Sequence, residues 1–175
     1  MMNDEWRMVN DAGHKIFCRH QNVGRQDRLQ IPLIKKCVLA TLDSEGVDAP
    51  CEISVLVTND GIIQGINLQY RDSDKPTDVL SFPMQEFSEP GWAYKEHCAA
   101  DPETGLIPLG EIVLSAKRVM KQAEEFGHPP EKETAYLTVH SVLHLLGYDH
   151  MDEAAGKKRM RKREKEILRE IGFLI

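Results

Sequence analysis

Alternation of apolar and polar positions marks four candidate β-strands along the chain. In the clearest of them, CEISVLVT at residues 51–58, apolar side chains recur at every second position, as a strand with one buried face requires. The segment VLSF at residues 79–82 is shorter and is stopped by Pro83, which lacks the N–H of a strand interior. The other two predicted strands are residues 14–20 and 108–116.

A longer period, with apolar residues three or four positions apart, predicts helices. Glycine, which can end a helix in the left-handed conformation at no steric cost, closes three of them. The predicted helices cover residues 28–42, 62–71, 116–127, 128–147 and 152–172. Strands and helices interleave without repeats or a linker, so we expect one α+β domain over residues 1–175, a small mixed β-sheet packed with helices.

Residues 84–107 show no period, and acidic residues there outnumber the single lysine. Loops of this length are uncommon unless they are functional or mobile. The segment is either a lid over a site or a variable insertion without consequence, and we favour the insertion.

The composition, with 41% hydrophobic and 29% charged residues in 175, is that of a soluble globular protein. No apolar run approaches the roughly 20 residues of a membrane span, and the polar, acidic N-terminal segment lacks a signal-peptide core. The cysteines lie far apart and form no CxxC pair, so we expect reduced thiols, mostly as small core residues. They are Cys18, Cys37, Cys51 and Cys98.

The net charge of −6 argues against nonspecific binding to nucleic acid, but the average conceals a basic segment. Residues 157–169, KKRMRKREKEILR, hold eight bases and two acids. They form either a stripe that binds an anionic partner or a solvated helix face, and the sequence does not decide between the two.

The strongest chemical signal is HSVLHLLGYDH, from His140 to His150. His140 and His144 are four residues apart, so their side chains lie on the same face of a helix. Gly147 ends that helix and allows the chain to bring His150 back toward the pair. Three imidazoles with an open fourth position suit zinc, although copper, nickel and iron also accept imidazole.

A similar histidine spacing occurs in metzincin proteases, which carry glutamate after the first histidine as the general base. Here Ser141 stands in that position, and a serine hydroxyl is no base near neutral pH. The spacing therefore keeps a metal-dependent peptidase open as an alternative, without its usual base.

Three segments together resemble the YbeY family of metal-dependent endoribonucleases. HSVLHLLGYDH is similar to its H-G-x-L-H-L-x-G-Y-D-H signature, with Ser141 in place of the usual glycine. NLQYRDSDKPTDVLSFP at residues 67–83 resembles a second family motif, and LGEIVLS at residues 109–115 resembles a third. The motifs occur in the family's order through the middle and later parts of the chain.

The resemblance implies one zinc ion on His140, His144 and His150, with the metal site on a helix and the turn after it. It also implies a cytoplasmic endoribonuclease specific for single-stranded RNA, which matures the 3′ end of 16S rRNA on the small ribosomal subunit and takes part in ribosome quality control. Arg71 matches the functional arginine of the second motif. A guanidinium can hold two phosphate oxygens as charge develops on them.

Other interpretations remain open at this stage. Without the resemblance, Arg71 would be taken as a surface arginine paired with Asp72 or Asp74. Asp78 and Ser81 belong to turn chemistry and are not assigned a catalytic role. Besides the peptidase, a ribosome-associated binding module with structural zinc is compatible with the histidines. The general base, the nucleophile and the oligomeric state are not indicated by the sequence.

Overall fold

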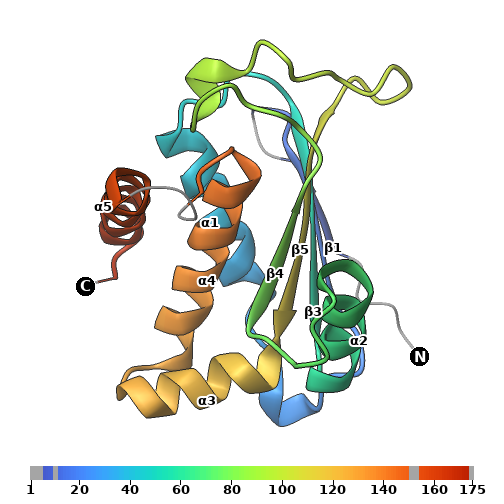
Figure 1. Cartoon of the computed structure of the whole chain (residues 1–175), viewed down its shortest axis with the longest axis vertical. Helices are drawn as coiled ribbons and strands as arrows, with labels where there is room; N and C mark the ends of the chain where they lie inside the picture. Colours follow the sequence, from blue (N-terminus) through green and yellow to red (C-terminus); the bar gives the residue numbers. More distant parts are fainter. Residues whose placement is uncertain (1–5, 10–11, 150–153, 174–175) are drawn as a thin grey trace.

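The computed structural model describes residues 6–9, 12–149 and 154–173, and within them five strands form one mixed sheet (Figure 1). The strand order is β1-β2-β3-β5-β4. β2, β3 and β5 run parallel, whereas β1 and β4 pair antiparallel at the two edges. The strands are β1 (Trp6–Val9), β2 (Lys15–His20), β3 (Cys51–Thr58), β4 (Val79–Pro83) and β5 (Ile107–Ser115).

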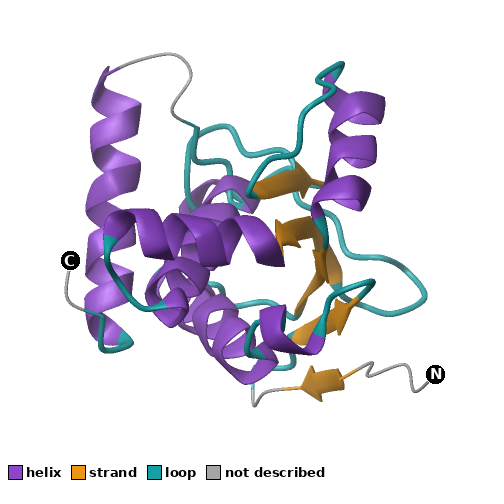
Figure 2. Ribbon diagram, turned by 90° about the horizontal axis from the view of Figure 1, so that it is seen from below, coloured by secondary structure: helices purple, strands orange, loops and turns teal. Residues whose placement is uncertain are grey.

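Helices lie on both faces of the sheet. α1 (Ile31–Ser44) and α4 (Pro130–Leu145) cover one face, and α2 (Asp60–Arg71) lies on the other (Figure 1). α3 (Ala116–Phe126) connects β5 to α4, and α5 (Ala154–Glu170) packs on the outside of α4, away from the sheet (Figure 2). Two short 3-10 turns, Arg25–Asp27 and Trp92–Tyr94, interrupt the connecting loops.

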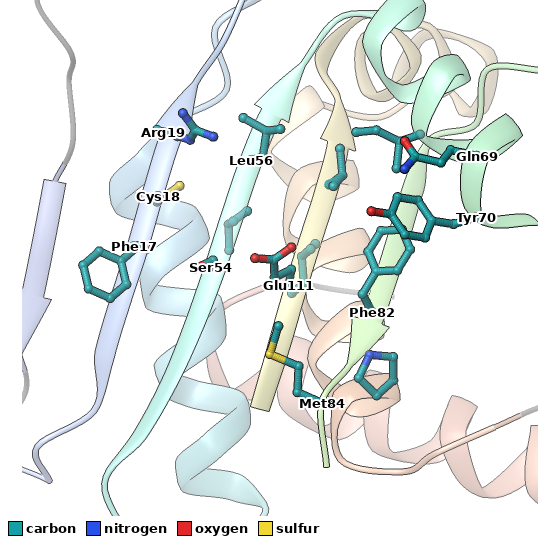
Figure 3. Close-up of a pocket in the computed structure, with 15 residues that line it drawn as sticks. Phe17, Cys18, Arg19, Ser54, Leu56, Gln69, Tyr70, Phe82, Met84 and Glu111 are labelled. Carbon is teal, nitrogen blue, oxygen red and sulfur yellow. The ribbon is translucent and has the colours of Figure 1, made fainter. Parts of the chain in front are cut away.

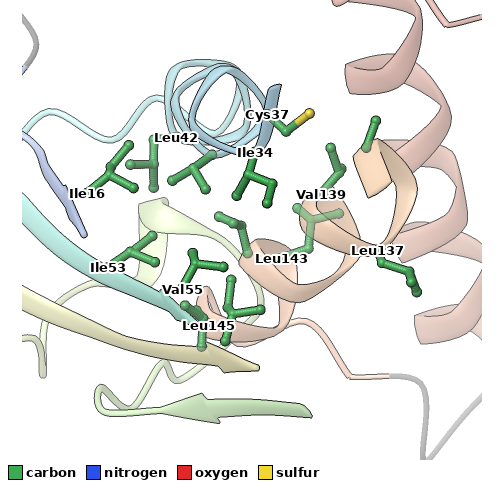
Figure 4. Packing of buried hydrophobic residues seen from close by; sticks show 14 of the residues in the cluster. Ile16, Ile34, Cys37, Leu42, Ile53, Val55, Leu137, Val139, Leu143 and Leu145 are labelled. Carbon is green, nitrogen blue, oxygen red and sulfur yellow. The ribbon is translucent and has the colours of Figure 1, made fainter. Parts of the chain in front are cut away.

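The main core lies between the sheet and the two helices α1 and α4 (Figure 4). Ile34 of α1, Ile53 of β3 and Leu143 of α4 meet there and are at most 1% exposed. This one-sided burial explains the strict alternation along β3. A second, smaller cluster joins α2 to the other face through Ile63, Leu80 and Val113.

α4 is buried around most of its circumference, because the sheet, α1, α3 and α5 all contact it. Apolar side chains consequently occur on several of its faces rather than on one stripe. A helix held in this way is a rigid support for the two histidines near its C-terminal end.

The predicted elements are confirmed with small shifts at their ends. Residues 51–58 form the predicted strand without change, and the predicted helix at 28–42 begins three residues later, at Ile31. The start of the last predicted helix, at residues 152–153, lies outside the described residues. β1 was not predicted, because a strand of four residues is too short to show a clear period, and it pairs with β2 alone.

Cys18, Cys37 and Cys51 are buried free thiols in the core, as predicted. Burial raises the pKa of each of these thiols to about 12, so they are protonated and unreactive. Among the helices of the described residues, none has the length and apolar content needed to cross a membrane.

Candidate metal centre and RNA site

His140 and His144 stand one turn apart on α4, with their rings edge to face and the ring centroids 4.6 Å apart. Their Nε2 atoms point toward each other at 3.1 Å. Two nitrogens bound to one tetrahedral zinc at about 2.0–2.1 Å lie about 3.3 Å apart. The pair therefore fits a shared metal ion with little rearrangement.

Glu164 of α5 contacts His140 at the ring nitrogen that does not face His144. Its Oε1 lies 2.6 Å from Nδ1 of His140, and the glutamate is only 5% exposed. A carboxylate only accepts, so Nδ1 must carry the proton and Nε2 presents its lone pair toward His144. A histidine that binds a metal through one ring nitrogen usually donates the N–H of its other ring nitrogen to a carboxylate in this way. No pattern in the sequence marks Glu164 as part of this site.

The C-terminal end of α4 turns at Gly147, as predicted. Its φ is +84°, and a Cβ atom there would lie 2.8 Å from Cβ of Phe87. After this turn, the amide of Tyr148 donates to the carbonyl of Leu143. His150 lies outside the described residues, so its place as third ligand stays a prediction. Among the described residues, no group of three His, Cys, Asp or Glu forms a metal-binding cluster.

The long loop at residues 84–107 packs against this end of α4. The amide of Gly91 donates to the carbonyl of Leu146 at 2.9 Å. Trp92 is 3% exposed and donates to Asp48, which fixes the loop to the segment after α1. These contacts favour a structural role for the loop at the turn after the histidines over the expected insertion without consequence.

The two histidines line a cleft of about 640 Å³, called the histidine cleft below. Its walls come from the end of α2, from β4 and from the C-terminal half of α4, three parts of the chain that are distant in sequence. The lining residues are Arg71, Asp78, Val79, Ser81, Pro83, Gln85, Tyr136, Leu137, His140, His144, Gly147, Tyr148 and Asp149.

Arg71 reaches this cleft although α2 lies on the opposite face of the sheet. It is the last residue of α2, and its Nη2 donates to the carbonyl of Ser81 at 3.2 Å. Ser81 belongs to the edge strand β4, so the guanidinium passes over the free edge of the sheet. Among the described residues, the hydrogen-bond partner of Arg71 is the carbonyl of Ser81 rather than Asp72 or Asp74, and Asp74 accepts from Gln64. The guanidinium is thus exposed and available to an anion.

The turn before β4 depends on Asp78. Its Oδ1 accepts from the amide of Val79 and the hydroxyl of Thr77, and its Oδ2 accepts from Gln122. These bonds occupy the carboxylate, as expected for turn chemistry. Asp149 also lines the cleft and precedes His150. No described contact assigns either carboxylate the role of general base.

Tyr136 stands one turn before His140, with ring centroids 5.8 Å apart. Desolvation by burial raises its pKa to about 12, and the negative charges of Glu164 and Glu133 act in the same direction. The phenol therefore stays protonated at neutral pH and can donate a hydrogen bond at the mouth of the cleft.

A larger hollow of about 810 Å³ lies on the other face of the sheet, beside α2 (Figure 3). Phe82, Tyr70 and Met84 give it apolar walls, and Glu111 points into it from β5 (Figure 3). It contains no histidine, and the pair of imidazoles makes the histidine cleft the better candidate for metal chemistry.

Comparison with known proteins agrees with the chemistry of the histidine cleft. The model of the family described as endoribonuclease YbeY matches residues 16–172. The endoribonuclease YbeY of Lachnoclostridium phytofermentans is 45% identical over 140 residues, covering 78% of this chain and 84% of the relative. That of Caldicellulosiruptor saccharolyticus is 44% identical over 164 residues, covering 91% and 98%.

The fold is also found among solved structures. The solution structure of TM1509 from Thermotoga maritima superposes with a TM-score of 0.52 at 25% sequence identity. The match covers 88% of this chain and 91% of that one, so it includes both the sheet and the helices around it. With the family match over most of the chain, these relatives establish that the chain belongs to the YbeY family of endoribonucleases, which are hydrolases.

Proposed function

We propose that the chain is a zinc-dependent endoribonuclease for single-stranded RNA that matures the 3′ end of 16S rRNA and serves ribosome quality control. We place it in the cytoplasm, associated with the small ribosomal subunit. Membership of the family implies a metalloenzyme that acts on RNA. The observation that carries the proposal is the histidine cleft, where Arg71 and two imidazoles with converging Nε2 atoms line one cavity.

In this proposal His140, His144 and His150 hold the metal, which would supply a Lewis acid for the phosphoryl group or an activated water. Glu164 keeps His140 in the tautomer that presents Nε2 to the metal. Arg71 is the candidate catalytic residue, because its guanidinium can bind the scissile phosphate and its developing charge. The shared cleft gives the arginine and the imidazoles access to the same phosphodiester.

The two alternatives are less well supported. For a peptidase, the position of the glutamate base is taken by Ser141, which is fully buried and does not face solvent. For a binding module with structural zinc, the histidines would not need an open cleft with an exposed arginine beside them. Both observations favour phosphodiester chemistry at the site.

A metal-dependence assay tests the proposal. The protein is stripped with a chelator and reloaded with zinc, and cleavage of a single-stranded RNA and of casein is followed in parallel. We expect RNA cleavage that is lost on stripping and restored by zinc, with no casein turnover. Zinc-dependent casein turnover without RNA cleavage would support the peptidase and contradict the proposal. Analysis of the RNA ends separates a 2′,3′-cyclic phosphate from a free 3′-hydroxyl, and so identifies the nucleophile.

A further inference from the structure

A small pocket of about 200 Å³ lies next to the histidine cleft, on the side of α5. His140 and Tyr136 line both cavities, so they form the boundary between them. We call this cavity the side pocket. It is lined by Tyr136, His140, Lys157, Met160, Arg161 and Glu164.

Two bases of the basic segment face the side pocket. Lys157 and Arg161 are four residues apart, so they lie on the same face of α5, and both are exposed. Glu164, one turn further along, is the only acid among the described residues that line the pocket, and its Oε1 lies within hydrogen-bond distance of Nδ1 of His140. Within this described lining, the exposed charged side chains are therefore the two bases Lys157 and Arg161.

Other bases of the same helix have structural partners. Arg163 is only partly exposed and donates to Glu45 at 2.7 Å and to the carbonyl and hydroxyl of Ser44. Burial acts to lower the pKa of this guanidinium, but its hydrogen bonds to Glu45 and Glu166 together raise the pKa above its usual value. Arg159 donates to the carbonyl of Pro90 and lies over the ring of Tyr148. These two arginines join α5 to the rest of the fold.

We infer that the side pocket is a phosphate subsite for single-stranded RNA, in which Lys157 and Arg161 bind a backbone phosphate next to the scissile one. This inference rests on the proposed function and specifies the path of its substrate. The strand would cross the boundary formed by Tyr136 and His140, with Arg71 on the far side of the histidine cleft. An exposed tyrosine at the boundary also offers a face on which a base can stack.

The experiment compares two double variants of α5 with the same change in charge. Lys157→Gln with Arg161→Gln alters the side pocket. Lys158→Gln with Lys162→Gln has the same spacing but lies on a neighbouring face, outside the residues that line the pocket. Zinc content and thermal unfolding of both proteins show whether the metal site and the fold are intact.

Binding is measured by fluorescence anisotropy with a labelled 2′-O-methyl oligoribonucleotide, over a range of salt concentrations. We expect the side-pocket variant to bind about tenfold more weakly, with the slope of log K against log salt reduced by roughly 0.7, the value for one phosphate contact of a single strand. The control variant should stay within about twofold of wild type. Equal losses in the two variants, or none in either, would overturn the inference.

Cleavage kinetics separate this inference from the proposed function. A dinucleoside monophosphate has a scissile phosphate but no neighbouring one, so the side-pocket variant should cleave it as wild type does. With a longer RNA, the same variant should show a raised KM and a nearly unchanged kcat. If wild type cleaves both substrates and the variant is equally impaired on both, the subsite is wrong. If wild type binds RNA through Lys157 and Arg161 but never cleaves it, the proposed function fails instead.

Discussion

Glu164 determines how His140 can bind a metal. The 2.6 Å contact with its carboxylate fixes the proton on Nδ1, so Nε2 would be the atom that binds the proposed ion. Glu164 comes from another helix, 24 residues further along the chain, within a segment whose basic residues dominate the pattern. The histidine spacing predicts the ligand pair, but no spacing rule connects a ligand to a carboxylate on another helix.

Replacing Glu164 should weaken metal binding without removing a ligand. We expect Glu164→Ala to lower zinc affinity by about 10- to 100-fold, the usual effect of losing the partner of a metal-binding histidine. Glu164→Gln keeps an acceptor without the charge and should fall between alanine and wild type. Competition with a chromophoric chelator measures the affinity, and Glu170→Gln, exposed on the same helix, is the control. Unchanged affinity in the alanine variant would remove Glu164 from the metal site.

Ser141 is a buried polar residue whose replacement should stabilise the fold. It is fully buried on α4, and among the described residues its hydroxyl has no hydrogen-bond partner. Ser141→Ala removes this unsatisfied group and introduces a better helix former, so we expect a gain of about 1 kcal/mol in the free energy of unfolding. Urea denaturation of the metal-free protein measures it. A destabilised variant would mean that the hydroxyl makes a favourable interaction in this position.

At the scale of elements, α4 is held from several sides. The sheet, α1, α3 and α5 pack around it, and the loop at residues 84–107 contacts the turn after its end. The limits of this helix could be predicted from its end signals, proline at its start and Gly147 just after its end. The role of the loop could not be predicted, because its hydrogen bond from Gly91 to Leu146 joins residues 55 positions apart and follows no local pattern.

The turn at Gly147 provides a test of this packing. Gly147→Ala places a Cβ at a positive φ and against Phe87, so we expect a loss of about 2 kcal/mol in the free energy of unfolding. Gly65→Ala is the matched change on an exposed face of α2, where a Cβ meets no atom within 4 Å. It should stabilise the protein by about 0.5–1 kcal/mol, because alanine is the better helix former. If both variants unfold like wild type, the loop does not constrain the turn.

At the scale of the whole molecule, the histidine cleft depends on the order of the strands. β4 follows α2 in sequence but pairs with β5 at the edge of the sheet, where Arg71 can pass over it toward α4. The strands and helices themselves could be predicted from hydrophobic patterns. That Arg71 and His140 line the same cleft could not be predicted from these patterns, because it depends on which strand occupies the edge of the sheet. Only the family resemblance indicated this arginine.

The most direct test is cleavage of a single-stranded RNA that contains the 3′ region of 16S rRNA, by wild type and by Arg71→Ala, with bound zinc measured in both. Arg71 is not one of the proposed metal ligands, so we expect the variant to keep its metal and to lose at least about a hundredfold in cleavage rate, as when one donor to a developing anion is removed. A variant that cleaves as fast as metal-loaded wild type would contradict the assignment of the histidine cleft as the site where RNA is cut.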